Sequence, residues 1–539
     1  MEKRGRISGL LMVCLICLGL GSARAEDAPG RTMARQATAG ATPWITTDHA
    51  NHEILRQQFT SGSDVTKACL TCHNEAGSQV MQTIHWTWRD PHSAEEEKIG
   101  KAGLTLNNFC ISIHGNEPRC TSCHAGYGWK DKSFDFTDQT KIDCLVCHEQ
   151  TGTYKKFPTM AGMPVDKPKK FGGKTFNPPD YNAVAQSVAR PTRQNCGTCH
   201  FFGGGGDGVK HGDLDSSLFM PNKALDVHMD GKGKNFNCTR CHTTVAHDIA
   251  GRSYRTPAFE TRKSLVEDDL TDKISCESCH TATPHKVGSK PNDHTDKVAC
   301  QTCHIPTFAR EKPTKMWWDW SKAGVKKDGK PYVEKGPYGK PVYMTKKGDM
   351  RWEKNVRPEY FWFNGSIETL TAKDQVDPTG EIAVNRPLGQ QDDPNARIFP
   401  FKVHRAKQPM DAEANNLVIP QLFGNKKSDA YWKHYDWTRA VAGGMEKAGL
   451  PFSGELAFAE TSYVFPITHM VAPKDNSVAC AECHTREGGR MSAANLSGFY
   501  MPGRDTGGPL EASGWAIVLA TLIGVVGHGV LRLLTKRKG

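Results

Sequence analysis

The pattern Cys-x-x-Cys-His occurs eight times along the chain and is the feature with the clearest chemical meaning. Two thiols at this spacing can form thioether bonds to the two vinyl groups of one haem, and the adjacent histidine can then bind the iron. Paired cysteines also bind zinc or form disulfides, but neither use requires a histidine after the second cysteine in every copy. We therefore predict eight covalently attached c-type haems (heme c). The motifs, numbered 1 to 8 in chain order, are Cys69, Cys72 and His73; Cys120, Cys123 and His124; Cys144, Cys147 and His148; Cys196, Cys199 and His200; Cys238, Cys241 and His242; Cys276, Cys279 and His280; Cys300, Cys303 and His304; and Cys480, Cys483 and His484.

The composition fits a chain folded around flat apolar cofactors. Sixteen of the 19 cysteines lie in the motifs, and only 37% of the 539 residues are hydrophobic, with 52 glycines and 31 prolines. Porphyrins supply apolar surface that such a chain lacks. We expect a mainly α fold with short helices and extensive irregular chain, organised around eight haems, plus one C-terminal transmembrane helix. The equal 24-residue spacings from Cys120 to Cys144 and from Cys276 to Cys300 predict two closely stacked haem pairs.

Both ends of the chain carry membrane signals. Residues 1–25 have a basic start, a short apolar stretch and small residues at the end, which is typical of an export signal peptide. Residues 515–534 are apolar over a length that can cross a bilayer, and the basic residues after them place that end in the cytoplasm. The body is therefore expected on the periplasmic side of the inner membrane, held by a single-pass anchor.

The motifs and signals divide the chain into five parts. These are the signal peptide (1–25), a seven-haem region with the expected active site (26–310), an aromatic and Lys-rich cap without motifs (311–475), the eighth haem region and linker (476–510), and the anchor with its basic tail (511–539). The cap either packs over the haems or docks a partner.

Histidines outside the motifs are the candidates for the second axial position of each iron. An electron-transfer haem usually holds two protein ligands, whereas a catalytic haem keeps one position open. Any one of these histidines could instead lie on the surface, and spacing does not pair them with particular haems. The candidates, which lie near motifs in sequence, are His52, His85, His114, His228, His247, His285, His294 and His469.

Two further features suggest that one haem differs from the rest. Cys110 is left over once the motif and signal cysteines are counted, and it is either a reactive thiol or a small buried hydrophobe. The run from Cys199 to Asp213 contains four consecutive glycines and Lys210. Burial lowers the pKa of a lysine and exposes a lone pair that can bind iron, although a solvated loop lysine is the simpler interpretation.

The sequence resembles the octahaem tetrathionate reductase family of c-type cytochromes. The likeness lies in residues 65–73, 83–88, 110–114 and 298–306 and in the glycine-rich run, and it spans most of the exported body. The family is similar in haem arrangement to pentahaem nitrite reductases and octahaem hydroxylamine oxidoreductases. The C-terminal helix departs from the soluble form of the family.

The resemblance implies seven bis-histidine haems and one active-site haem, which is expected at motif 2. In the family that iron has an unusual lysine ligand. Lys210 is the first candidate for it here, and Lys155 or Lys156 is the reserve. The competition between such a lysine and His124 is left open, and Cys110 is expected near the same pocket. Lys210, Cys110 and His124 are thus the candidate catalytic residues.

These features predict a reductase that passes electrons to a small sulfur or nitrogen anion. The candidate reactions are tetrathionate to thiosulfate, and nitrite or hydroxylamine to ammonium, with electrons from a quinol-oxidising or cytochrome donor at the membrane. The alternatives are a non-catalytic relay between the quinol pool and periplasmic acceptors, or hydroxylamine oxidation. The formal charge of +11 is not taken as a sign of nucleic-acid binding, because eight haems would add roughly 16 propionate groups.

Overall fold

The computed structural model describes residues 28–38, 47–91, 93–251, 275–491, 496, 498–505 and 508–536. The expected signal peptide lies outside these residues. The haem motifs fall on short helical segments, where one turn brings residues i, i+3 and i+4 to the same side. Those segments are α3 (Gly62–Leu70), α6 (Glu117–Cys120) with η4 (Thr121–Cys123), α7 (Cys144–His148), α9 (Arg193–His200), η7 (Cys238–Arg240), α11 (Glu277–His280), α12 (Cys300–His304) and α15 (Cys480–Cys483).

Short elements and irregular chain connect the motifs in residues 28–310, as the sequence predicts. A cluster around the buried Val65, Leu145 and Val184 packs the first and third motifs together. The connecting elements are α2 (Pro29–Thr38), η1 (His49–Asn51), η2 (Glu53–Leu55), α4 (Ala76–Met81), α5 (Ile84–Thr87), η3 (Glu95–Glu97), η5 (Gln139–Lys141), β1 (Lys169–Phe171), β2 (Lys174–Phe176), α8 (Tyr181–Gln186), η6 (Ser216–Phe219), β3 (Thr244–Val245), β4 (Asp248–Ile249) and η10 (Lys290–His294).

The cap, residues 311–475, is built on a nine-stranded sheet that the sequence interpretation did not anticipate. Its main strand order is β11-β15-β13-β5-β8-β7-β6, and β9 and β14 pair with β13. The long central strand β13 pairs antiparallel with β15 and parallel with β5. The cap elements are β5 (Thr314–Asp319), η11 (Trp320–Lys322), β6 (Val333–Lys335), β7 (Pro341–Met344), β8 (Gly348–Glu353), β9 (Glu359–Phe363), β10 (Ile367–Thr369), β11 (Ile382–Ala383), β12 (Asn385–Pro387), β13 (Arg397–Asp411), β14 (Asn416–Leu417), α13 (Tyr431–His434), α14 (Trp437–Ala448), β15 (Leu456–Pro466) and η12 (Lys474–Asn476).

Strand β13 is covered on both faces, so its polar side chains are enclosed along with its apolar ones. Lys402, His404 and Gln408 are all fully buried on this strand. Buried polar groups require partners, and this strand therefore brings hydrogen-bonding chemistry into the interior.

One hydrophobic cluster joins the cap to the haem region. Phe109 and Val209 pack with Trp318 and Trp320 of the cap, and Cys110 lies against the same cluster. The segment around Cys110 and the glycine-rich loop are therefore held against the sheet, and the first of the two interpretations of the cap, a packed cover, describes these contacts.

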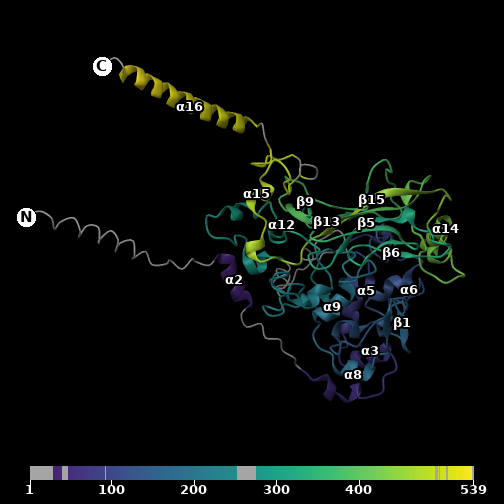
Figure 1. The fold of residues 1–539 in the computed structure, drawn as a ribbon. Coiled ribbons are helices and arrows are strands. Elements are labelled where there is room, and N and C mark those ends of the chain that lie inside the picture. The colour runs from purple at the N-terminus through teal and green to yellow at the C-terminus, as the bar shows by residue number, and fades with distance from the viewer. Residues whose placement is uncertain are drawn as a thin grey trace, which may run out of the picture.

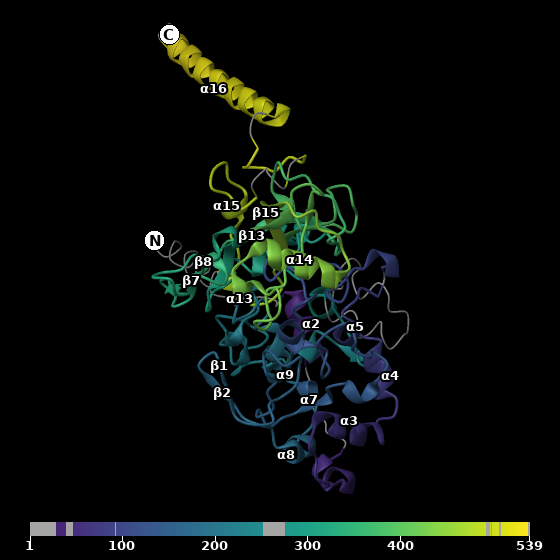
Figure 2. The same ribbon diagram turned by 90° about the vertical axis from the view of Figure 1, so that its right-hand side faces the viewer.

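Helix α16 (Pro509–Lys536) extends away from the body (Figure 1). Within the described residues, its segment Glu511–Thr535 is the single stretch long and apolar enough to cross a membrane. Both views place α15, with motif 8, toward α16, whereas α3, with motif 1, lies at the opposite end (Figure 2).

Candidate haem and substrate site

Seven motif histidines each face a second histidine across a gap of constant width. Two imidazole nitrogens bound on opposite sides of a metal, each about 2 Å from it, put the ring centroids about 6 Å apart. The observed separations match this geometry, so the residues fit a haem iron between each pair. The pairs are His73–His49 (6.3 Å), His148–His247 (6.4 Å), His200–His85 (6.1 Å), His242–His469 (6.2 Å), His280–His228 (6.0 Å), His304–His285 (6.1 Å) and His484–His294 (6.1 Å).

Two of the eight histidines expected from sequence do not take such a position. His49, and not His52, faces His73; His49 is the first residue of η1, whereas His52 lies between η1 and η2. His114 approaches the carbonyl oxygen of Gly103 at 2.6 Å and faces no motif histidine within the described residues. The other six expected histidines lie opposite a motif histidine.

Cys72 of motif 1 lies at the surface of the protein. Helix α3 ends at Leu70, and Cys72 follows it in a turn, where its amide donates to the carbonyl oxygen of Cys69 at 3.2 Å. Cys69, on the helix, is half-buried, whereas Cys72 is exposed and its Sγ lies 3.8 Å from the Thr71 hydroxyl. Haem attachment through Cys72 stays a prediction, for a site at the protein surface.

His124 of motif 2 is the exception among the motif histidines. Its backbone leaves the turn in an extended conformation, and its amide donates to Thr121. In motif 1, by contrast, the His73 amide donates to the first cysteine, Cys69, at 2.9 Å. The change of backbone direction turns the His124 ring away from the side on which the other motifs present theirs.

The His124 ring is enclosed in an aromatic cage. Its Nε2 lies 2.7 Å from the carbonyl oxygen of Trp86, and its Nδ1 is buried without a partner. Burial lowers the pKa of His124 to about 3, so the ring is neutral. The surrounding rings are Trp86, Trp88, Trp129, Phe134 and Phe136.

Lys156 lies beside motif 2 in the space that His124 leaves. Its ammonium donates to the carbonyl oxygens of His124 and Gly126 and forms a 3.1 Å ion pair with Asp143. Lys156 is buried, whereas Lys155 is exposed. The structure therefore distinguishes between the two reserve candidates: Lys156, and not Lys155, contacts motif 2.

Lys210, the first candidate from sequence, lies at the end of the glycine-rich loop. Gly204 adopts a φ of +75°, and a side chain there would meet Val209 and Lys210 at 3.0 and 3.3 Å. This close approach folds the loop back on itself. The Lys210 ammonium lies 5.3 Å from the ring centroid of Phe465, and burial lowers the pKa of Lys210 to about 7.

Cys110 lies among the amines of three lysines. Its thiol interacts electrostatically with Lys210, Lys315 and Lys347, and with Cys120 of motif 2. Lys315 and Lys347 also flank Trp318 from the cap, at 3.2 and 5.4 Å from its ring centroid. Burial lowers the pKa of both lysines. The structure thus brings Cys110 and Lys210 together beside motif 2.

The cap supplies residues to this site that sequence reasoning missed. The buried ammonium of Lys402 donates to the carbonyl oxygens of Val209 (3.1 Å) and Lys210 (2.9 Å), and so anchors the glycine-rich loop. His404, two residues further along β13, donates from its Nδ1 to Asn108 Oδ1 at 2.8 Å, while its Nε2 is buried without a partner. A lysine and a histidine alternating with apolar residues in the run 401–404 were the available signal, since both then share one face of a strand.

Cysteine side chains from different motifs lie near one another. These contacts show which haem sites are neighbours. Four pairs of cysteine side chains lie close together: Cys69 with Cys144, Cys123 with Cys199, Cys196 with Cys238, and Cys276 with Cys300. Cys276 and Cys300 lie close together, as do Cys144 and Cys69. The stacked haem pairs expected from the spacings Cys120 to Cys144 and Cys276 to Cys300 stay predictions.

Further contacts link these pairs into one path. Cys147 interacts electrostatically with Cys196, and Cys241 with Cys279. Motifs 7 and 8 are joined by a 2.9 Å hydrogen bond from the Val478 amide to the Cys303 carbonyl oxygen. The sites run in the order 8–7–6–5–4, and branch at motif 4 to motif 2 on one side and to motifs 3 and 1 on the other.

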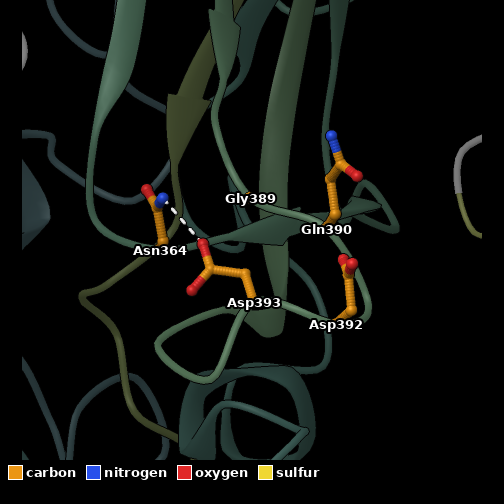
Figure 3. A pocket seen from close by; sticks show the side chains of 5 residues that line it. All are labelled: Asn364, Gly389, Gln390, Asp392 and Asp393. Carbon is orange, nitrogen blue, oxygen red and sulfur yellow. Dashed lines mark hydrogen bonds between the residues drawn. The ribbon is translucent and has the colours of Figure 1, made fainter.

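An open surface cavity of about 360 Å³ lies apart from these motifs (Figure 3). Asn364 donates to Asp393 across it at 2.9 Å, and Gly389, Gln390 and Asp392 complete its lining. None of these residues belongs to a haem motif or to the lysine cluster around Cys110.

Thioether-forming cysteine pairs on short helices, each with an axial histidine, define a c-type cytochrome that binds haem covalently. Two family models match: "Cytochrome c bacterial" over residues 315–487, and "Cytochrome c7 and related cytochrome c" over residues 223–305. The solved structure of an octaheme cytochrome c from Shewanella oneidensis is similar at a TM-score of 0.74 and 42% identity, covering 86% of this chain and 99% of that chain. The chain belongs to the octahaem cytochrome c family. An uncharacterized protein of Archaeoglobus fulgidus is 22% identical over 262 residues, 41% of this chain and 86% of the relative.

Proposed function

We propose that the chain carries eight haems and reduces a small sulfur or nitrogen anion at the haem of motif 2. The observation that supports this most directly is the contrast between seven motif histidines that face a second histidine and His124, which does not. A haem with one available axial position delivers electrons to a molecule bound there. The other seven haems, with two histidine ligands each, conduct electrons toward it.

Lys156 is our candidate for the lysine ligand of that iron. To bind iron, the Lys156 amine would lose one proton and exchange its contact with the carbonyl oxygen of His124, the residue that would otherwise supply the ligand. Asp143 holds the side chain in place, and the hydroxyls of Tyr127 and Tyr154 donate to Asp143 at 2.8 and 3.0 Å. Lys210 lies instead with Cys110, and we assign it to substrate binding.

The lysines around Cys110 favour an anionic substrate. A buried ammonium is destabilised by the loss of water, and a bound anion compensates for that loss. Lys210, Lys315 and Lys347 would hold the anion, while Lys402 keeps the loop of Lys210 in position. Cys110 offers a sulfur contact to a sulfur substrate. Tetrathionate needs two electrons to break its central S–S bond and release two thiosulfates, and nitrite and hydroxylamine are reduced to ammonium.

The path of thiol contacts supports electron entry from the membrane side. Motif 8 lies toward α16 in both views (Figures 1 and 2). By the contact of Cys123 with Cys199, motif 2 lies at one end of the path that begins there. We infer a body on the periplasmic side of the inner membrane, anchored by α16, with a quinol-oxidising protein or a cytochrome as donor.

Turnover of the purified full-length protein with tetrathionate, nitrite and hydroxylamine in parallel, using a reduced dye, tests this proposal. We expect oxidation of the dye with at least one of the three. Cyanide and nitrite are also expected to shift the absorption spectrum of one haem in eight. A protein that turns over none of them, and whose spectrum neither anion changes, would be an electron relay.

A further inference from the structure

The imidazole of His469 is hydrogen-bonded to a fully buried carboxylate. Asp213 Oδ2 lies 3.1 Å from His469 Nδ1 and also accepts from the backbone amides of Thr468 (2.8 Å) and His469 (3.0 Å). The Thr468 hydroxyl lies 3.0 Å from the same Nδ1. Asp213 is 1% exposed, and its other oxygen, Oδ1, has no partner. This carboxylate is thus directed at the ring that faces His242 of motif 5.

Seven other imidazoles that face a partner across a haem site have Nδ1 contacts in the described residues, and none of these contacts is a hydrogen bond to a carboxylate. For His228 the nearest carboxylate oxygen, on Asp226, is 4.0 Å away, beyond a hydrogen bond. The remaining contacts are all to neutral carbonyl oxygens. They join His148 to Ala189 (2.9 Å), His242 to Ala250 (2.7 Å), His484 to Pro502 (2.7 Å), His294 to Lys290 (3.1 Å), His247 to the Gln79 side chain (2.8 Å) and His285 to the Asn292 side chain (3.2 Å).

We propose that Asp213 is a positioning residue that makes the motif-5 haem the lowest-potential member of the bis-histidine set. A carboxylate that accepts the Nδ1 proton fixes the ring orientation and makes the imidazole a stronger electron donor to the metal, which favours the ferric state. Burial strengthens the effect, because no water screens the negative charge. The inference rests on the assignment of His242 and His469 as axial ligands, and not on any catalytic activity.

The position of motif 5 gives this residue a role in electron flow. In the order given by the cysteine contacts, motif 5 lies between motifs 6 and 4, on the path from motif 8 to motif 2. A low-potential haem there separates the membrane-side haems from the pocket-side haems. Electrons that have reached motifs 4 and 2 must move uphill to return, which retains them until a reduction that needs several electrons is complete.

A potentiometric titration of the haem-loaded full-length protein, followed by absorption and EPR spectroscopy, tests the proposal. Asp213→Asn keeps the shape of the side chain and leaves a neutral oxygen at Nδ1, as in the other pairs. We expect the midpoint potential of one low-spin haem to rise by about 59 mV. For a one-electron couple this is about a tenfold increase in the ferrous-to-ferric ratio at a given potential. Asp226→Asn is the comparison variant. Its carboxylate also interacts electrostatically with His469 but accepts no imidazole Nδ1 proton, so we expect a smaller shift of the same midpoint.

The reciprocal variant tests the same rule without disturbing motif 5. Asn292→Asp places a carboxylate at His285, and we expect the haem of motif 7 to become harder to reduce. Unchanged midpoints in Asp213→Asn with all haems retained would overturn the proposal. If that variant loses haem, an unchanged titration of Asn292→Asp would overturn it as well. Neither measurement uses turnover, so a failed activity assay would leave this result intact.

Discussion

At the scale of single residues, His124 and Lys156 show how one motif can share its sequence with seven others and still differ from them. The extended backbone at His124 moves its ring into an apolar cage, where the neutral imidazole keeps one hydrogen bond to Trp86. Lys156 then fills the polar space next to the motif. A buried lysine with an ion pair and carbonyl partners is stable there, because each of its donors can be satisfied.

Replacing Lys156 tests its assignment as the iron ligand. Lys156→Gln removes the amine but leaves Asp143 its two tyrosine donors, so we expect a folded protein. The spectrum of one haem should change, and turnover should fall about 100-fold or more. Absorption and EPR spectra of the ferric protein provide the measurement. Lys155→Gln, at the exposed neighbouring position, is the control. An unchanged haem spectrum in Lys156→Gln would return the ligand role to Lys210.

Lys210 makes a separate prediction about pH. Burial, and next the nearby Lys101, lower the pKa of Lys210 to about 7. The amine is therefore cationic below pH 7 and neutral above it. We expect the KM for tetrathionate, whose charge does not change in this range, to rise by up to about tenfold per pH unit above pH 7. Lys210→Gln should remove this dependence, whereas Lys346→Gln, on the exposed neighbour of Lys347, should retain it. A pH-independent KM in the unmodified protein would contradict the role given to Lys210.

At the scale of elements, the glycine-rich loop positions Lys210 through backbone geometry. Gly204→Ala introduces a side chain that meets Val209 and Lys210, at a left-handed φ of +75°. Gly173 has a similar φ of +78° with nothing within 4 Å, so Gly173→Ala shares the backbone strain of about 1–2 kcal/mol without the contact. We expect both variants to lower the free energy of unfolding, but only Gly204→Ala to raise KM. Equal KM values in the two variants would show that the loop does not position the substrate lysine.

Local spacing predicts the haem attachment sites because all the required residues lie within one helical turn. The same spacing cannot choose between His49 and His52, since both lie next to motif 1 in sequence and only the turn η1 decides which ring faces His73. The contacts of Lys402 are harder to predict from sequence. Its partners at Val209 and Lys210 lie almost two hundred positions away, and they come together only when β13 takes the centre of the sheet.

The composition of the chain did not indicate the nine-stranded sheet of the cap. Low hydrophobicity and abundant glycine and proline favoured short helices and irregular chain, which describes residues 28–310 well. In the cap, however, residues 401–404 of β13 alternate as in a half-exposed strand, whereas the structure buries Lys402 and His404 as well as the apolar residues.

At the scale of the whole molecule, the branch at motif 4 gives different roles to the two ends. Motif 8 lies toward α16 and begins the path to motif 2, whereas motif 1 lies at the far end on a side branch through motif 3 (Figure 1). A donor in the membrane would deliver electrons at motif 8, and motif 1 would not be needed for them to reach motif 2.

Removing one haem at each end separates these roles. When Cys480 and Cys483 are both replaced by alanine, dye-driven turnover should persist, because a small dye can reduce any exposed haem. Turnover driven by a short-chain menaquinol in native membranes should fall about tenfold or more, since the first contact of the path is missing. The matched variant, in which Cys69 and Cys72 are both replaced by alanine, also loses one haem but should retain both activities. Quinol-driven turnover that depends on motif 1 and not on motif 8 would reverse the direction of electron flow inferred from the contacts between the motifs.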